Sequence, residues 1–344
     1  MRLLAALQHL FDPSGPRPAS PDPERTIDTP LRFPDRPSAY PPDASEIPVL
    51  VVAYYPVRNG LVDIAATGDV GGPLPAVQDH VRRTTGRVIG ALEVGSTYHG
   101  YKDPAAQPAL RYRIVDWLEF LEPLPTWHNP RYTHVPMTDY NAIMDRVDIE
   151  TQVMTRGVKE VWVWGYHGNV VGLWESNMAG PYGDISNSDR DPADLPALPR
   201  TYTVYHYNYQ RGPSEAVEDH MHQIEAVLRH VDHDLFWNRF VGRTGEGRCG
   251  WTHYPPNAVR DYDWANRHYA ETDLEDWRPD GSGAKLWMNC RRWHCDSLTW
   301  FTYWMQNIPG RDNGLVDHGR PLTNWWTFIG DFDRAMGEGM GLVG

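Results

Sequence analysis

The sequence predicts an α/β fold, namely a layered, mostly parallel β-sheet with helices on both faces, joined to an irregular tryptophan-rich C-terminal region packed on it. Between residues 46 and 232, apolar β-branched runs alternate with segments of helical periodicity, as in parallel sheets whose strands are connected by helices. After residue 232 this alternation stops, and ten of the fifteen tryptophans follow among Gly, Pro, Asn and Asp. We therefore expect three parts, residues 1–45, 46–232 and 233–344.

The first part is predicted to be an extended arm. Residues 12–45 contain ten of the thirty prolines. Because proline fixes the backbone angle φ and lacks an N–H donor, this segment cannot form a regular helix or a central strand. The chain opens with MRLLAALQHLF, which no small-residue cleavage site follows, so there is no clear signal peptide. The localisation stays open, an extracytoplasmic one included.

Four strands and three helices are predicted in the second part. The run IPVLVVAYYP at 47–56 is continuously apolar and β-branched, which is typical of a strand buried on both faces. Residues 111–121, 158–167 and 200–209 give three further strand patterns. Apolar spacing predicts helices over 74–94, from about 139 to 154, and over 215–231. The carboxyl ends of parallel strands meet at one edge of a sheet, so we expect the binding crevice there.

The third part shows helical patterns only near 297–306 and 325–336. It has too little periodic structure to fold alone, so we expect it to wrap the core and to wall the crevice with aromatic rings. Its three cysteines, Cys249, Cys290 and Cys295, leave at least one thiol unpaired within the chain. The spacing of Cys290 and Cys295 can close a small loop, whereas a zinc site would lack the paired C-x2-C signature. The pairing of the cysteines stays open.

The charge balance limits the partners of the chain. The formal net charge is −13 and the pI is about 5.5, which argues against nucleic acid or an anionic membrane surface, because both need a basic face. No apolar run approaches the roughly 20 residues that cross a bilayer, so no transmembrane segment is expected. A glycan or another small neutral substrate fits better, and the oligomeric state stays open.

A long segment after the 158–164 strand is the first candidate for a site. The sequence WGYHGNVVGLWESNMAGPYGDISNSDRD begins at residue 164 and shows no regular pattern. Long loops of this kind are usually functional. His167 and Glu175 are the candidate catalytic residues, and Trp174 and Asn177 the candidate substrate-binding residues. If the strands are neighbours, His167 and Glu175 face the start of the 215–231 helix.

That helix carries a second candidate. Glu215, Glu218, His222 and Glu225 follow the spacing 3, 4, 3 beside the apolar stripe, so they lie along one side of the helix. Partly covered carboxylates have shifted pKa values, so Glu215, His222 and Glu225 are candidate catalytic residues. Arg211, just before the helix, is a candidate for substrate binding. His222 and Glu225 also have the spacing at which one helix offers two metal ligands.

Two further segments supply polar side chains. The stretch CGWTHYPPNAVRDYDW places Trp251, His253 and Asp263 among aromatics and prolines, which suits a groove for a sugar or peptide. The Asp-rich pieces at 184–194 and 276–283 offer the oxygen ligands that calcium uses, without the spacing of an EF-hand loop. The P-loop, G-x-G-x-x-G, H-E-x-x-H and G-x-S-x-G signatures are absent.

Two motifs carry a resemblance. ESNMAG at 175–180, and Y-N-Y-x-R-G followed by E-x6-H-x-x-E at 207–225, resemble a family of bacterial proteins with no assigned activity. The similarity covers about residues 47–232. It singles out Glu175, Glu215, His222 and Glu225 and implies no reaction or substrate.

These observations predict a hydrolase that acts on a glycan through carboxylate and histidine acid–base chemistry at the carboxyl edge of the sheet. One alternative is a metal-dependent amide or ester hydrolase with His167, His222 and Glu225 as ligands and Glu175 or Glu215 as base. The other is a non-catalytic carbohydrate-binding protein. Zinc, calcium and no cofactor at all are left as alternatives.

Overall fold

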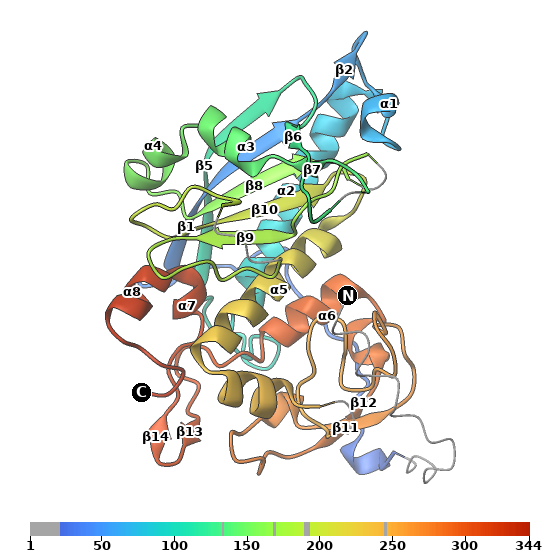
Figure 1. The fold of residues 1–344 in the computed structure, drawn as a ribbon. Helices are drawn as coiled ribbons and strands as arrows, with labels where there is room; N and C mark the ends of the chain where they lie inside the picture. The colour runs from blue at the N-terminus through green and yellow to red at the C-terminus, as the bar shows by residue number, and fades with distance from the viewer. Residues whose placement is uncertain (1–20, 133, 168–169, 189–192, 244–245) are drawn as a thin grey trace.

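The computed structural model describes residues 21–132, 134–167, 170–188, 193–243 and 246–344. Its centre is a five-stranded sheet in the order β5-β1-β8-β10-β9 (Figure 1). The strands are β1 (Ser45–Tyr54), β5 (Leu110–Phe120), β8 (Glu160–Gly165), β9 (Ser176–Ala179) and β10 (Tyr202–Asn208). The first four positions in this order pair in parallel, and β9 pairs antiparallel to β10. The prediction of an α/β fold with a mostly parallel sheet is therefore confirmed.

Each of the four predicted strands forms, and β9 is an addition. It lies inside the segment from residue 164 that was expected to lack regular structure, so that expectation is wrong for Ser176–Ala179. The strand has the polar sequence SNMA and is only four residues long, so its alternation is too short to read. It forms because its backbone pairs with the edge of β10, as in Tyr205↔Ser176.

Two long helices, α2 (Leu74–Gly95) and α5 (Pro213–Val231), lie beside the sheet and pack against each other, and the shorter α6 (Ser297–Met305) packs against both of them. The third predicted helix divides into α3 (Tyr140–Arg146) and α4 (Ile149–Met154). Asp148 separates them, because its φ of 51° is left-handed and its side chain caps α4 by accepting from Thr151 N.

The remaining elements are short. The helices are α1 (Ile64–Thr67), α7 (Thr327–Gly330) and α8 (Phe332–Gly337); the 3₁₀-helices are η2 (Pro23–Arg25), η4 (Leu274–Asp276) and η5 (Cys290–Trp293); and the π-helix is η3 (Asp234–Val241). The strands are β2 (Val57–Arg58), β3 (Leu61–Val62), β4 (Gly72–Pro73), β6 (Thr126–Trp127), β7 (Met137–Thr138), β11 (Ala270–Thr272), β12 (Leu286–Met288), β13 (Val316–Asp317) and β14 (Arg320–Pro321).

Strand β10 shows how the sheet uses its two faces. Side chains alternate along a strand, and Tyr205 and Tyr207 both contact His220 of α5, with ring centroids 3.7 and 6.1 Å apart. His206, between them, points the other way and lies 3.1 Å from the hydroxyl of Tyr140 in α3. The predicted 215–231 helix thus packs on the sheet through its apolar side.

Many tryptophans after residue 232 are buried. Trp293, Trp300, Trp304, Trp325 and Trp326 are among the largest fully buried side chains. The proline-rich segment runs across this region, since Ile27 N donates to Trp287 O at 2.8 Å and Leu31 N to Arg292 O at 3.0 Å. Within the described part of this segment, the 3₁₀-helix η2 forms a single helical turn.

The cysteines do not form a metal site. Cys290 and Cys295 are joined in a disulfide, and Cys249 is a buried free thiol. His294, between them, binds the carbonyl of Leu31 instead, at 2.5 Å from Nε2. Within the described residues, no helix is both long and apolar enough to cross a membrane.

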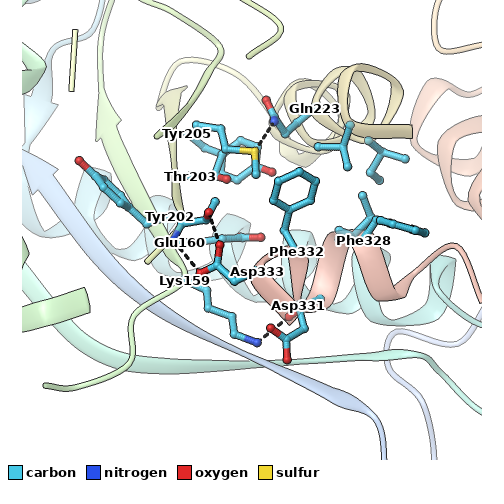
Figure 2. Close-up of a pocket in the computed structure, with 16 residues that line it drawn as sticks. Lys159, Glu160, Tyr202, Thr203, Tyr205, Gln223, Phe328, Asp331, Phe332 and Asp333 are labelled. Carbon is cyan, nitrogen blue, oxygen red and sulfur yellow. Dashed lines mark hydrogen bonds between the residues drawn. The ribbon is translucent and has the colours of Figure 1, made fainter. Parts of the chain in front are cut away.

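The amino edge of the sheet is closed by α7 and α8. A small cavity of about 60 Å³ lies at the starts of β8 and β10, and Figure 2 shows the side chains that line it. Lys159 donates to Gly330 O at 2.6 Å, and Thr201 N donates to Asp333 at 2.9 Å. Glu160 is buried beside them, and its carboxylate accepts from Trp162 Nε1 at 2.7 Å.

Candidate metal centre and pocket

The largest group of predicted site residues lies at the carboxyl edge of the sheet. There, β8 and β10 end in register, with Asn208 beside Gly165. The loops that follow them border a pocket of about 500 Å³ together with the first turns of α5. The pocket is lined by His167, Leu173, Glu175, His206, Tyr207, Asn208, Arg211, Gly212, Ser214, Glu215, Ala216, Glu218, Asp219, Tyr262, Trp264 and Ser297.

Three side chains converge beside this pocket. The Nε2 atoms of His222 and His253 are 2.9 Å apart, and Glu218 Oε1 lies 2.8 Å from His253 Nε2 and 3.9 Å from His222 Nε2. Donor atoms of a tetrahedral zinc ion are about 3.3 Å apart, given zinc–nitrogen bonds of about 2.0 Å. Among the described residues, this is the one group of three such ligands that converges. We call Glu218, His222 and His253 the His₂Glu cluster.

Carboxylates hold the other nitrogen of each histidine. His222 Nδ1 lies 3.2 Å from Glu225 Oε2, and His253 Nδ1 lies 3.0 Å from Asp261 Oδ1. The other oxygen of Glu225 accepts from Thr252 N at 2.9 Å. Metal-binding histidines usually donate their second N–H to a carboxylate, which fixes the tautomer and aims the free nitrogen at the metal. Both Nε2 atoms are therefore oriented toward the same point.

The charges of the cluster follow from these contacts. Burial alone would raise the pKa of Glu218, but the hydrogen bonds of His222 and His253 outweigh it and lower that pKa to about 2. Burial would lower the pKa of His222, yet its bonds to Glu218 and Glu225 raise it well above its ordinary value. The contacts thus favour an ionised Glu218 beside a protonated His222, and a metal ion that bound here would displace the proton of His222.

Aromatic rings enclose the cluster. The ring of His253 lies 4.0 Å from that of Tyr262 and 5.6 Å from that of Trp251, centroid to centroid. Tyr262 has a φ of 58°, a left-handed conformation that costs a bulky residue about 1–2 kcal/mol. Its side chain is 55 % exposed, so core packing does not account for this backbone. Such strain is concentrated at functional sites.

The other residues that line the pocket include charged and polar side chains. Glu175 accepts a hydrogen bond from Asn187 at 2.6 Å, and its charge acts on His222. Arg211 forms an exposed ion pair with Glu215 at 3.8 Å. Burial, and then the charge of Arg211, lowers the pKa of His167. The predicted catalytic residues Glu175, Glu215 and His167 thus share one pocket, and His222 lies beside it in the cluster.

The inner end of the pocket holds two buried groups. Burial, and then the charge of Glu175, raises the pKa of Asp219 well above its ordinary value. Burial, and then the charge of His167, lowers the pKa of His206 to about 3. Both side chains line the pocket, so it presents neutral polar groups at depth and charged ones around them.

The predicted metal ligands are arranged differently from the expected set. His222 is in the cluster, but Glu225 binds its Nδ1 and therefore lies behind the histidine. His167 lines the pocket and is not a member of the converging group. The cluster uses Glu218 and His253 instead, and His253 was expected to contact substrate.

The other predicted substrate-binding residues have structural contacts. Trp174 N donates to the hydroxyl of Tyr140 at 2.7 Å, and Asn177 is a buried residue of β9. Asp263 accepts from Val259 N at 2.9 Å and from Asn266 at 2.8 Å, which shapes its loop. Trp251 contacts the ring of His253 from outside the pocket. Of the predicted binding residues, Arg211 lines the pocket.

The structure brings several residues to the pocket or the cluster to which the sequence had assigned no role. They are His206, Glu218, Asp219, Asp261 and Tyr262. Glu218 had a usable signal, because it precedes His222 by one helical turn on the same side. His206 had none, since it lies within a strand of aromatic residues.

The Asp-rich segments are explained by local hydrogen bonds. Asp280 accepts from Ser282 N at 3.0 Å, and Asp276 accepts from Ala284 N at 2.8 Å. In the first segment, Asp184 binds Ser186, and residues 189–192 lie outside the described part.

No protein-family model, no curated protein and no solved structure matches this chain.

Proposed function

We propose that this protein is a metal-dependent hydrolase that cleaves an amide or ester, with Glu218, His222 and His253 as the metal ligands. The observation that carries the proposal is the convergence of the two Nε2 atoms and Glu218 Oε1 within 2.8 to 3.9 Å of one another. Two imidazoles and one carboxylate are a ligand set of catalytic zinc sites, which keep a fourth position open for water. Calcium prefers oxygen ligands throughout, so zinc or a similar transition metal fits better.

The surroundings support this choice over cleavage by carboxylates alone. Glu225, which was expected to act on substrate, binds both His222 and Thr252 and does not line the pocket. Its carboxylate is therefore used to position a ligand. Glu218 belongs to both the cluster and the pocket wall, so a substrate in the pocket reaches the metal past this residue.

A metal ion held by Glu218, His222 and His253 would lower the pKa of a bound water toward neutrality and would polarise a carbonyl. Glu175, which lines the pocket, would act as the general base for the attacking water and would return that proton to the leaving nitrogen or oxygen as the scissile bond breaks. Arg211 and His167 also line the pocket and would stabilise the negative charge that develops on the carbonyl oxygen.

The tryptophan-rich region contributes to the site in this proposal. Tyr262, Trp264 and Ser297 line the pocket, and His253 is a ligand. We therefore retain the expectation that residues 233–344 wall the crevice, with the sheet and α5 forming its other side. A carbohydrate-binding protein without activity remains the contrasting proposal, and metal content separates the two.

The first test is metal content by mass spectrometry on tag-free protein. We expect about one zinc or similar ion per chain in the wild type, and loss of more than nine-tenths of it in both His222→Ala and His253→Ala. His268→Ala is the matched control, because this histidine is exposed and outside the cluster. Hydrolysis of a p-nitrophenyl ester should disappear with the metal and return when zinc is added to the wild type.

A wild type that binds no transition metal at micromolar free concentration would refute the proposal. So would a His222→Ala variant that keeps its metal while His268→Ala behaves like the wild type. Thermal unfolding of each variant shows whether a loss of metal merely reflects a loss of fold.

A further inference from the structure

His206, which lines the pocket, has a ring nitrogen without a partner in the described chain. His206 is 1 % exposed, and its Nδ1 lies 3.1 Å from the hydroxyl of Tyr140. Its Nε2 has no hydrogen-bond partner within the described part of the chain. Leaving a buried polar atom unpaired is unfavourable. A binding site recovers this free energy when its ligand supplies the missing partner.

Gly165 leaves the room that the imidazole ring of His206 occupies. A Cβ atom at this position would lie 2.8 Å from His206 Nε2 and 2.8 Å from a methyl group of Leu124. Distances below 3.0 Å are not tolerated without movement. Any side chain at position 165 would therefore displace the imidazole.

The charges around His206 indicate an uncharged ligand group. Burial and the neighbouring His167 lower the pKa of His206 to about 3, so its ring is neutral and gives an anion no attraction. The carboxylates of Glu175, Glu215 and Glu218 also line the pocket and outnumber Arg211, which is paired with Glu215 at 3.8 Å, so the lining as a whole disfavours an anion. A hydroxyl group satisfies a neutral imidazole nitrogen as either donor or acceptor.

The rim of the pocket supplies an aromatic surface. Tyr262 and Trp264 both line it, with ring centroids 5.4 Å apart, and the ring of Tyr262 is 55 % exposed. Aromatic rings with a few placed polar groups are typical of small-ligand sites. A sugar ring presents both features that this pocket matches, because it has hydroxyl groups at its edge and apolar C–H groups on its face.

We propose that the pocket binds a sugar ring of a neutral glycan, with one hydroxyl group bonded to His206 Nε2 and the apolar face against Tyr262. The inference rests on the proposed function in one respect, which is that the amide or ester cleaved there is a substituent of the bound sugar. His206 and Tyr262 are then residues that determine specificity.

Binding can be measured by calorimetry with three neutral disaccharides as probes, namely N,N′-diacetylchitobiose, cellobiose and maltose. We expect at least one of them to bind the wild type, and its Kd to rise at least tenfold in His206→Leu and in Tyr262→Ala. Tyr254→Ala is the control for the second variant, because the Tyr254 ring stacks on Trp251 and does not line the pocket. Its Kd should stay within twofold of the wild type.

The inference is overturned if none of the three disaccharides binds, or if His206→Leu and Tyr262→Ala both bind as the wild type does. Tyr262 is exposed, so its variant decides the question even if His206→Leu fails to fold. Chelator-treated protein separates this result from the metal proposal. If the protein binds a sugar but has no affinity for metal, the hydrolase proposal is refuted and the sugar site stands. If the protein binds metal but no sugar, the sugar site is refuted and the hydrolase proposal stands.

Discussion

The two edges of the central sheet use their polar groups in opposite ways. At the amino edge, Lys159 and Thr201 bind Gly330 and Asp333, and the cavity that remains measures about 60 Å³ (Figure 2). At the carboxyl edge, the cavity measures about 500 Å³ and is lined by His206, whose Nε2 has no partner in the described chain. The comparison teaches that the hydrogen bonds of Lys159 and Thr201 close the amino edge, whereas the unpaired nitrogen of His206 at the carboxyl edge is open to the ligand proposed above.

The largest effect is expected at the carboxyl edge. Glu175→Gln removes the proposed base while keeping the shape of the side chain, so hydrolysis should fall about 10²- to 10⁴-fold. The metal content should stay at the wild-type level, because Glu175 is not in the cluster. Steady-state kinetics beside mass spectrometry checks this. Equal activity in the variant would remove Glu175 from the mechanism.

The next effect concerns the amino edge and pH. Burial raises the pKa of Glu160 to about 8, against the partial compensation of its hydrogen bond from Trp162. Below about pH 4.5 the carboxyl group of Glu160 is protonated in both the folded and the unfolded chain. Between about pH 4.5 and 8 it is protonated only in the folded chain. Unfolding therefore releases a proton in this window, and the stability from this group falls as pH rises, by up to about 5 kcal/mol.

Glu160→Gln cannot release that proton. Its free energy of unfolding should fall less between pH 5 and 8 than that of the wild type, as followed by urea denaturation at several pH values. Parallel pH profiles of the two proteins would show that Glu160 is ionised in the fold.

A smaller effect is expected behind the metal ligand. Glu225→Gln keeps a partner for His222 but loses the charge, so the metal Kd should rise about 10- to 100-fold. A competitive chelator titration measures this. Asp261→Asn offers the matching change behind His253, and the two variants together show whether both carboxylates act through their histidines. If neither variant changes the metal Kd, the metal is not bound through the Nε2 atoms of His222 and His253.

The smallest effect returns to the amino edge. Asp333→Ala removes the acceptor of Thr201 N and of its hydroxyl, which should lower the free energy of unfolding by about 1–3 kcal/mol. Metal content and sugar binding should not change. A variant that lost metal here would show that the two edges are coupled and would break the comparison.

The periodic parts of the sequence were sufficient for the fold. Continuous apolar runs predicted β1 and β8, and spacing predicted α2 and α5, because both patterns follow from local backbone geometry. The break at Asp148 was missed because a left-handed residue leaves no periodic signal. Strand β9 was missed because its pairing with β10 is a tertiary contact.

The site was predictable only where it lies on a regular element. Helical spacing placed Glu218, His222 and Glu225 on one side of α5, but spacing alone does not tell a ligand from the residue that holds it. His253 and Asp261 lie in an irregular segment, so nothing local indicated that they meet α5. That contact depends on how the chain folds back over 31 residues.

The length of that return has a mechanical consequence. The disulfide between Cys290 and Cys295 spans a separation of 5 residues, whereas an ion shared by His222 and His253 would close a loop of 31. A cross-link restricts the unfolded chain more when its loop is longer, by about 4 kcal/mol for this loop against about 2 for the disulfide. A metal ion bound here would therefore add a removable cross-link between the C-terminal region and α5, beside the packing of α6 on that helix. Taking the metal away should loosen residues 249–264 before any other part of the chain.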